Sequence, residues 1–306
     1  MAAWLGGIIV RLSLLTLRIF LAAVEEGNIG KAAQREHIAA SAVSKRIRDL
    51  EAELQVKLLR RHVKGVEPTA AGTALAGHVR NLFGILGRMR GELSEHAEGE
   101  HGQVRVHANG SAIVEYLAEQ VREFRAAHPM VRIDLREELS AEVVRSVHDG
   151  VADLGIYAGN VEAPPGLQIF PYRTDRLMVI LPASHPLAGR ATVAFEELLD
   201  LDHIAVAESS SLAALLAEIA GTLNRPINVI CTVTRNEVAR SMVQAGLGVA
   251  ILPEGFVRPY EGALRIRGVP LVDAWARRQL NICVRDAAGL TVAARRFLDR
   301  LRRLPD

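Results

Sequence analysis

The first helical pattern in the chain is predicted to run from about Leu14 to Glu26. Its apolar residues recur with the spacing of one helix face and are Leu17, Phe20, Leu21 and Val24. A helix with this spacing buries that face against its neighbours. Gly27 ends the pattern, and Asn28 is a suitable N-cap for a second short helix, in which Ala32 and Ala33 allow close packing.

A third helix is predicted to follow His37 and Ile38. One of its faces is apolar and consists of Val43, Ile47, Leu50 and Leu54. The opposite face carries small, hydroxyl and basic residues at the same spacing, namely Ser41, Lys45, Arg48 and Ala52. A short helix that is packed on a small core and presents hydroxyl and basic groups outward is typical of a helix that enters a DNA groove.

A basic segment, LLRRHVKGVEPTAAG, follows the third helix. It carries Arg60, Arg61 and Lys64, and Gly65 is a turn signal. We interpret the segment as a two-stranded wing whose basic side chains meet DNA phosphates. A solvated surface loop is the alternative.

A long helix is predicted to begin after Thr69, which is a suitable cap. Its apolar residues recur at steps of four and three and are Leu75, Val79, Leu82, Leu86, Met89 and Leu93. This heptad spacing is the signature of helices that pair in a coiled coil, so we expect a dimerisation helix. A single helix that packs on its own domain is the alternative, although it would favour a wider apolar face.

Strands and helices alternate from Gln103 to the C-terminus, after a polar hinge at 98–102. Strand-like runs occur around Ile169 and at 177–183, and a helix is predicted over Ser111–His128. The alternation predicts an α/β fold with mostly parallel strands. The length of this region allows two small lobes, each with its own sheet.

Charge is divided unevenly along the chain, although the net charge is only +2. Residues 1–96 hold 14 Lys/Arg and 9 Asp/Glu, whereas residues 97–306 hold 23 and 26. A basic front end on a mildly acidic body suggests a polyanion partner for the front end alone.

The cysteines and the N-terminus point to a cytoplasmic protein. Cys231 and Cys283 lie in apolar, strand-like runs and are interpreted as buried hydrophobic residues rather than a redox pair, which fits a reducing compartment. Residues 1–10, MAAWLGGIIV, lack a basic leader and reach Arg11 too soon for a signal peptide or a membrane span. We expect them to be an extension before the first domain.

Three predicted strand-to-helix turns carry small polar residues: Asn109–Ser111, Ser209–Ser211 and Thr232–Asn236. Ligands of α/β sheets gather at such turns, where helix N-termini offer free N–H groups. A cleft lined by these turns would suit a small anion such as a carboxylate. Ordinary helix capping is the alternative for each turn taken alone.

The sequence contains none of the common catalytic or phosphate-binding motifs, so no enzymatic activity and no cofactor are expected. Glu137 and Glu138 are adjacent, and neighbouring residues on a strand point to opposite faces, which argues against joint acid–base catalysis by this pair. His107 is as consistent with a strand residue as with a ligand contact. A set of polar residues at the hinge, His96, Glu98, Glu100 and His101, lacks the spacing of a metal site.

The chain resembles LysR-type transcriptional regulators from about Arg11 onward. The resemblance rests on FLAAVEEGNIGKAA, on the helix that ends in SKRIRDLE, on the basic wing, and on LPASHPLA and AGLGVAILP in the body. It implies a winged helix-turn-helix (11–68), a dimerisation helix (69–97), a hinge (98–102) and an effector domain (103–306) like that of type 2 periplasmic binding proteins. Within that domain, lobe I would cover 103–172 and 273–306, and lobe II would cover 173–272.

The resemblance also implies partners. Homodimers or homotetramers would bind double-stranded promoter DNA, a small-molecule effector would lie between the two lobes, and RNA polymerase would be recruited. A receptor module without a role in transcription and an enzyme on the same α/β body are the rival hypotheses. The basic front end opposes the first, and the missing catalytic motifs oppose the second.

Carried over by position, the resemblance implies a set of DNA-binding residues: Asn28, Lys31, Ala40, Ser41, Ser44, Lys45, Arg48, Arg60, Arg61 and Lys64. Ala40 stands where the family often has Gln, which removes an amide that could pair with adenine, although a methyl contact with thymine stays available. Glu36 stands where an apolar residue is frequent, so that face is expected to be more exposed.

The implied effector contacts are Asn109, Ser111 and Glu138 from the first lobe and Ser209, Ser210 and Asn236 from the second. Glu138 would repel an acidic ligand unless it is paired. A carboxylate at this position could therefore select a ligand that carries an amine or a hydroxyl group.

Overall fold

The computed structural model describes residues 12–62, 65–98, 102–159, 161–207 and 209–303. The predicted N-terminal extension, Lys64 and most of the hinge lie outside this part of the chain. The chain divides into two compact units, residues 1–87 and residues 88–306. None of the helices in the described ranges is long and apolar enough to span a membrane.

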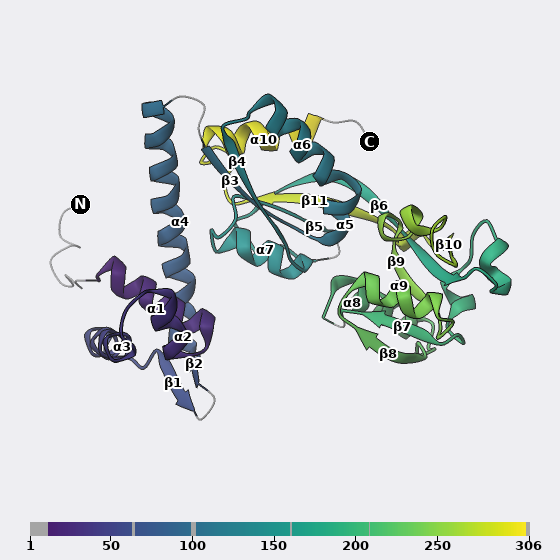
Figure 1. The fold of residues 1–306 in the computed structure, drawn as a ribbon, viewed down its shortest axis with the longest axis horizontal. Helices are drawn as coiled ribbons and strands as arrows, with labels where there is room; N and C mark the ends of the chain where they lie inside the picture. Colours follow the sequence, from purple (N-terminus) through teal and green to yellow (C-terminus); the bar gives the residue numbers. More distant parts are fainter. Residues whose placement is uncertain (1–11, 63–64, 99–101, 160, 208, 304–306) are drawn as a thin grey trace. The chain divides into compact units, whose positions relative to one another are not determined.

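The N-terminal unit is a three-helix bundle with a two-stranded wing (Figure 1). Its elements are α1 (Leu14–Glu26), α2 (Ile29–Arg35), α3 (Ala40–Leu54), β1 (Leu59–His62), β2 (Gly65–Pro68) and the start of α4 (Ala70–Glu98). The core is formed by the apolar faces predicted for α1 and α3, with Phe20 and Val43 fully buried. The predicted helices and the wing are therefore confirmed.

The wing is fastened to the bundle beside the turn between α1 and α2. The backbone N–H of Val66 donates to the carbonyl oxygen of Gly27 over 2.9 Å. Gly65 has a φ of +146°, and a Cβ there would lie 2.2 Å from the same oxygen. Only glycine fits this close approach without displacing the backbone.

Helix α4 begins where Thr69 was expected to cap it, because the Thr69 hydroxyl accepts from the N–H of Gly72 over 3.0 Å. The predicted seam is divided between two environments. Leu75 and Leu82 pack against the core of their own unit, and Val79 is only 2 % exposed. Val79 can therefore add almost no buried area to a dimer, which corrects its assignment to the seam.

Farther along α4, apolar side chains are left open to solvent. Ile85 is 51 % exposed and Met89 is 50 % exposed, and they lie one turn apart on the same face. Leu86 is partly buried. Leu93 is part of α4, but its side chain lies outside the described residues.

The first lobe of the unit 88–306 is a five-stranded sheet with helices on both faces. In spatial order its strands are β4 (Val131–Glu137), β3 (Gly102–Ala108), β5 (Leu154–Ala158), β11 (Arg277–Val284) and the first part of β6 (Gln168–Pro182). Helices α6 (Ala118–Ala127) and α10 (Val292–Arg303) cover one face, where the rings of Phe124 and Phe297 lie 4.8 Å apart. Helix α7 (Ser140–His148) covers the other face (Figure 1).

The second lobe also has a helix on each face of its sheet. The second part of β6 pairs with β9 (Ala250–Pro253) and β10 (Ile266–Pro270), and β7 (His203–Val206) pairs with β8 (Val229–Val233). Alternate side chains of β6 pack toward α8 (Ser211–Thr222) and toward α9 (Asn236–Gln244). Each lobe thus has its own core.

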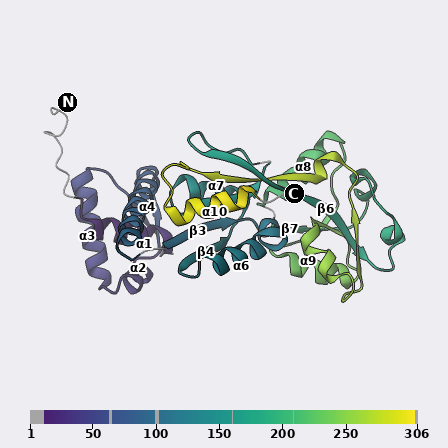
Figure 2. The same ribbon diagram turned by 90° about the horizontal axis from the view of Figure 1, so that it is seen from above.

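Two sequence-based expectations for this unit are wrong. In the described residues of the unit, three strand pairings are parallel and four are antiparallel, so the sheets are mixed rather than mostly parallel. The runs around Ile169 and at 177–183 are one strand, β6, which continues from the first lobe into the second (Figure 2). Every pairing of β6 is antiparallel, because its partners β9, β10 and β11 return toward the first lobe.

The helix predicted over Ser111–His128 is interrupted by a π-helical turn. It consists of α5 (Gly110–Ala112), the π-helical turn at Ile113–Leu117, and α6. Such turns widen the backbone spiral by one residue and re-aim the side chains that follow. Here the turn carries Glu115, whose side chain reaches the second lobe.

Both cysteines are free, and they lie on strands of different lobes. Cys283 is fully buried on β11, as expected, and Cys231 is partly buried on β8. Burial raises the pKa of the Cys283 thiol to about 12, which keeps it protonated and inert at neutral pH.

Candidate functional site

The outward face of α3 is the first candidate site. Ala40, Ser41, Lys45 and Arg48 are exposed and Ser44 is partly buried, whereas Val43 and Ile47 on the opposite face are buried. Ala39 at the N-cap offers no side-chain acceptor, so no capping side chain occupies the N–H groups of the first turn. A helix end of this kind is suited to approach a phosphate.

Asn28 and Lys31 lie at the start of α2. The Oδ1 atom of Asn28 accepts from the N–H of Gly30 over 2.8 Å and from the N–H of Lys31 over 3.1 Å. Asn28 thus caps the helix, as predicted. The Lys31 side chain is exposed.

Glu36 is less exposed than expected. Its carboxylate accepts a hydrogen bond from Nε of Arg18 over 2.7 Å, and its side chain is only 9 % exposed. The ion pair with α1 draws the carboxylate onto the bundle. The prediction that an acidic residue opens this face is therefore wrong.

The wing presents Arg60 and Arg61 to solvent. The guanidinium of Arg60 lies 3.9 Å from the carboxylate of Glu67 on β2, which is a weak surface pair. Arg61 is exposed on the neighbouring position of β1. Both cations are thus free to meet a phosphate backbone.

Glu51 holds the wing onto α3, and the sequence patterns did not single it out. Its carboxylate is buried and accepts from the N–H groups of Leu58 and Leu59 over 3.0 and 3.2 Å and from Nζ of Lys57 over 2.7 Å. Burial alone would raise the pKa of Glu51. The bonds from Lys57, Leu59 and Leu58 outweigh burial and bring that pKa below its ordinary value of 4.5.

Glu51→Gln is expected to destabilise the N-terminal unit by about 1–3 kcal/mol at pH 7, because an amide leaves buried donors poorly paired. Because folding lowers the pKa of Glu51, the ionised carboxylate stabilises the folded unit. This contribution to the free energy of unfolding is fully present above the unfolded-state pKa and is lost as the pH falls through the folded-state pKa. The difference between wild type and Glu51→Gln should therefore shrink on acidification below about pH 4.5. Hydrogen exchange of β1 amides across this pH range measures it.

Glu53→Gln, at an exposed position of the same helix, is the matched control. It should leave exchange in β1 unchanged at both ends of the pH range. An equal effect of the two substitutions would show that Glu51 does not anchor the wing.

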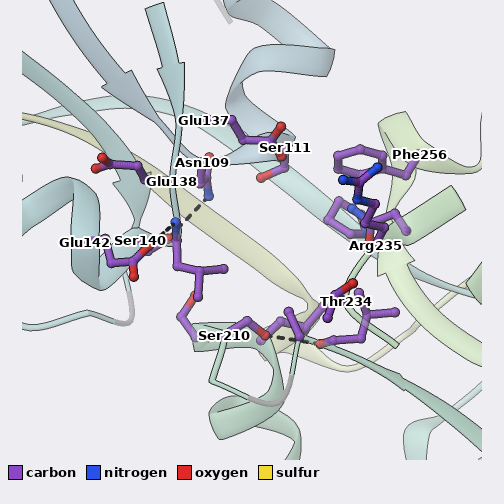
Figure 3. Close-up of a pocket in the computed structure, with 18 of the residues that line it drawn as sticks. Asn109, Ser111, Glu137, Glu138, Ser140, Glu142, Ser210, Thr234, Arg235 and Phe256 are labelled. Atoms are coloured by element: carbon purple, nitrogen blue, oxygen red, sulfur yellow. Dashed lines mark hydrogen bonds between the residues drawn. The ribbon is translucent and has the colours of Figure 1, made fainter. Parts of the chain in front are cut away.

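The second candidate site is a cleft of about 390 Å³ between the two lobes of the unit 88–306 (Figure 3). Five of the six predicted effector contacts line it: Asn109, Ser111, Glu138, Ser210 and Asn236. Ser209 does not line the cleft and is exposed. The helix α8 is capped one residue later, by Ser210, which turns Ser209 away and corrects that assignment.

Hydrogen bonds fix the first-lobe wall of the cleft. Oδ1 of Asn109 accepts from the N–H of Ala112 over 3.0 Å, and its Nδ2 donates to Oγ of Ser140 over 3.5 Å. Ser140 in turn accepts from the N–H of Ala158 at the end of β5. Capping and cleft formation therefore coincide at this turn.

Ser111 is the exception in this network. It is only 4 % exposed, and its Oγ has no hydrogen-bond partner within the described residues. A buried hydroxyl without a partner is costly and therefore rare in native proteins. Because Ser111 lines the cleft, a bound ligand can satisfy it.

The Glu138 carboxylate contacts two residues that lie outside the cleft lining. Its Oε2 accepts from the Ser146 hydroxyl over 2.8 Å and lies 2.9 Å from Nδ1 of His107, although that nitrogen is not aligned for a hydrogen bond. His107 is only 2 % exposed and lies behind Glu138 rather than in the cleft lining.

Two further carboxylates and an aromatic ring line the cleft, and the sequence patterns did not assign them to it. They belong to Glu137, Glu142 and Phe256. Glu137 and Glu138 were expected to point to opposite faces. Both line the cleft, because β4 ends at Glu137 and the alternation of a strand no longer applies beyond it. The hydrophobic residue Phe256 comes from the second lobe and carries no sequence signal for a site.

Two arginines complete the lining. Arg278 on β11 is buried and makes two hydrogen bonds to the buried carboxylate of Asp175, one of them from Nε over 2.8 Å. Arg235 is exposed and occupies the N-cap position of α9, where it makes no side-chain capping bond. The charge of Arg278 is thus neutralised within the protein, and that of Arg235 faces the cleft.

A hydrogen bond joins the lobes near the cleft. Oε1 of Glu115, on the π-helical turn, accepts from the N–H of Gly255 over 3.0 Å. Burial raises the pKa of Glu115 to about 7. The hydrogen bond from Gly255 lowers this pKa, whereas the nearby carboxylates of Asp175 and Glu254 raise it further. Glu115 is therefore partly protonated near neutral pH.

The sequence and the fold identify the family to which the chain belongs. A profile of the LysR substrate binding domain matches residues 97–305, and one of the bacterial regulatory helix-turn-helix protein, lysR family, matches residues 14–73. The chain belongs to the LysR family: it is a LysR-type DNA-binding transcriptional regulator with an effector-binding domain.

Individual proteins agree with this assignment. The transcriptional regulator AlsR of Bacillus subtilis is 32% identical over 242 residues, which cover 78% of this chain and 79% of AlsR. The uncharacterized regulator YbhD of Escherichia coli is 26% identical over 282 residues, covering 92% of this chain and 88% of YbhD.

Solved structures show the same fold. The crystal structure of CbnR, a LysR family transcriptional regulator, has a TM-score of 0.69 at 22% identity and covers 95% of this chain and 99% of CbnR. Full-length CbnR complexed with its target DNA has a TM-score of 0.68 at the same identity and the same coverage.

Proposed function

We propose that this regulator docks α3 in the major groove of promoter DNA, with the wing on the adjacent phosphates. The observation that carries the proposal is the division of α3 into a buried apolar face and an exposed face with Ser41, Lys45 and Arg48. Arg60 and Arg61 extend the exposed basic surface onto the wing. CbnR, which shares this fold, has been solved in complex with its target DNA, and this supports DNA binding by the present chain.

Ala40 limits how the helix reads its operator. A methyl group cannot make the paired hydrogen bonds of an amide, so we expect the operator preference to rest on Ser41, Ser44 and Lys45 together with the shape of the DNA. Direct contact of Ala40 with a thymine methyl group remains compatible with its exposure.

Lys45→Ala is expected to weaken binding to the operator by about 1–3 kcal/mol, because the ammonium contacts a base edge or a phosphate. If the contact is to a phosphate, the slope of log K against the logarithm of the salt concentration should also become shallower by about one unit. Gel-shift titrations against the upstream region of the protein's own gene, at several salt concentrations, measure both quantities.

Arg267→Ala is the matched control, since it removes one exposed cation from the unit 88–306. It should leave operator affinity and salt slope unchanged. Equal affinities of wild type and Lys45→Ala for the operator would show that α3 does not dock as proposed.

We further propose that two copies pair through α4 and that dimers associate into tetramers. Ile85 and Met89 support this, because two large apolar side chains on one face of a helix are exposed in the single chain. Pairing would place two copies of α3 on two half-sites of an operator.

Ile85→Glu with Met89→Glu is expected to convert dimers into monomers, because pairing would bury two charges on each helix. Sedimentation velocity measures the change. Thr73→Glu, at an exposed position on another face of α4, is the control and should leave the oligomeric state unaltered. Intact dimers of the double variant would rule out this seam.

We also propose that the cleft between the lobes is the effector site and that its occupant changes how the regulator holds DNA and recruits RNA polymerase. The cleft lies in the part of the chain that matches the LysR substrate binding domain. Its volume is within the range of sites for small molecules.

A further inference from the structure

We propose that the cleft binds a small zwitterion of the amino acid class, with its ammonium group against the first lobe and its carboxylate group against the second. The proposal rests on the effector function proposed above and specifies the chemistry of the ligand. It is carried by an unequal distribution of charge across the cleft and by the unpartnered hydroxyl of Ser111.

The first-lobe wall is acidic. Glu137, Glu138 and Glu142 all line the cleft, and the first-lobe lining contributes no cation other than Arg278, which is already paired with Asp175. Glu137 is exposed and makes no hydrogen bond or ion pair within the described residues. A carboxylate ligand at this wall would meet like charge, whereas an ammonium group would be attracted.

The position of Glu137 favours a cation further. A Cβ added to Gly110 would lie 2.7 Å from Oε1 of Glu137 and 3.1 Å from Cζ of Phe256. The carboxylate oxygen of Glu137 therefore lies close to the Gly110 backbone, and the tip of the Phe256 ring bounds the space beside it. A carboxylate binds an ammonium group through charge-assisted hydrogen bonds, so Glu137 supplies the contact for the cation.

Ser111 supplies the observation that is independent of charge. Its Oγ is buried without a partner, and its side chain lies beside Glu137 in the cleft (Figure 3). The hydroxyl oxygen can accept a hydrogen bond from an ammonium group that also contacts Glu137. The ligand would thus satisfy an atom that the protein itself leaves unsatisfied.

The second-lobe wall has the opposite character. The guanidinium of Arg235 has no carboxylate partner in the described part of the chain, and Arg235 lines the cleft. It stands at the start of α9, a nine-residue helix whose N-cap makes no side-chain hydrogen bond. Free N–H groups, the helix dipole and a guanidinium together favour a carboxylate at this end.

A ligand with both groups therefore meets complementary charge on both lobes, while an amine or an acid alone satisfies one wall only. The helix N-termini on the first-lobe side do not reverse this conclusion, because Asn109 caps one and the Glu142 side chain accepts from the N–H of Leu139 at the other. A zwitterion that contacts both walls would also draw the lobes together.

The test uses the full chain and the twenty protein L-amino acids, each titrated while the melting temperature is followed. For any amino acid that binds, two analogues of the same skeleton are titrated as well: the amine without the carboxylate group and the acid without the ammonium group. We expect saturable binding of at least one amino acid and at least about tenfold weaker binding of both analogues, because each loses a charge-assisted contact.

Substitutions in the two walls separate the two contacts. Glu137→Gln should reduce the preference for the amino acid over its deaminated acid, and Arg235→Gln should reduce the preference over its decarboxylated amine. Glu237→Gln and Arg132→Gln, at exposed positions outside the lining, are the controls and should keep both preferences.

Absence of binding by all twenty amino acids, or an acid that binds as tightly as its parent amino acid, would overturn the proposal. Gel shifts of the same preparations distinguish this outcome from failure of the proposed function. A preparation that protects a specific operator but binds no zwitterion contradicts the ligand class alone.

Discussion

Arg278→Ala is expected to lower the free energy of unfolding of the unit 88–306 by about 3–5 kcal/mol. The side chains of Arg278 and Asp175 are 7% and 0% exposed, and their bond joins β11 to β6 where β6 leaves the first lobe. Removal of the guanidinium leaves a carboxylate that is buried without a counter-charge. Urea denaturation followed by the fluorescence of Trp275 measures the loss.

The double variant Arg278→Met with Asp175→Asn separates charge from packing. It removes both charges together, and replacement of a whole buried ion pair is often close to neutral, so most of the stability should return. A single variant as stable as wild type would show that water or a rearrangement compensates Asp175. A double variant no better than Arg278→Ala would assign the loss to packing.

Phe20→Ala is expected to destabilise the N-terminal unit by about 3–5 kcal/mol, because it empties the position of a fully buried aromatic side chain. Phe20 lies in the core with Val43 and Ile47, on which α3 is packed. Operator binding should fall with the folded fraction of this unit. Hydrogen exchange of α3 amides and gel-shift affinity together measure the effect.

Leu15→Ala, at a 40% exposed position of the same helix, is the matched control and should leave α3 exchange and operator affinity nearly unchanged. Exchange in β3 and β5 should be the same in both variants, since these strands belong to the other compact unit. Loss of DNA binding by Phe20→Ala without faster exchange in α3 would contradict the stated cause.

The structure changes how the acidic residues of the two sites are understood. Glu36 and Glu51 look like solvent-facing helix residues in the sequence, yet one is held by Arg18 and the other anchors the wing. In the cleft, Glu137 joins Glu138 because the strand ends between them. In each case the environment of the carboxylate, rather than its presence, defines its role.

Local signals were enough for the DNA-reading unit. The prediction of a helix over Leu14–Glu26, of Asn28 as a cap and of a wing that turns at Gly65 is confirmed, because periodicity, capping and turn chemistry act between residues close in the chain. The same reasoning found Asn109, Ser111, Ser210 and Asn236, since small polar residues at strand ends are a local pattern.

Contacts between distant segments were beyond these signals. β11 pairs with β5 and β6 more than one hundred positions away in the chain, so neither the antiparallel direction of these strands nor the Arg278–Asp175 pair is written in a local pattern. Val79 fits a heptad repeat, but the three-dimensional fold buries it in its own unit. Helices, caps and turns are thus encoded by neighbouring residues, whereas strand partners, burial and the charge of the cleft arise when the folded chain brings remote residues together.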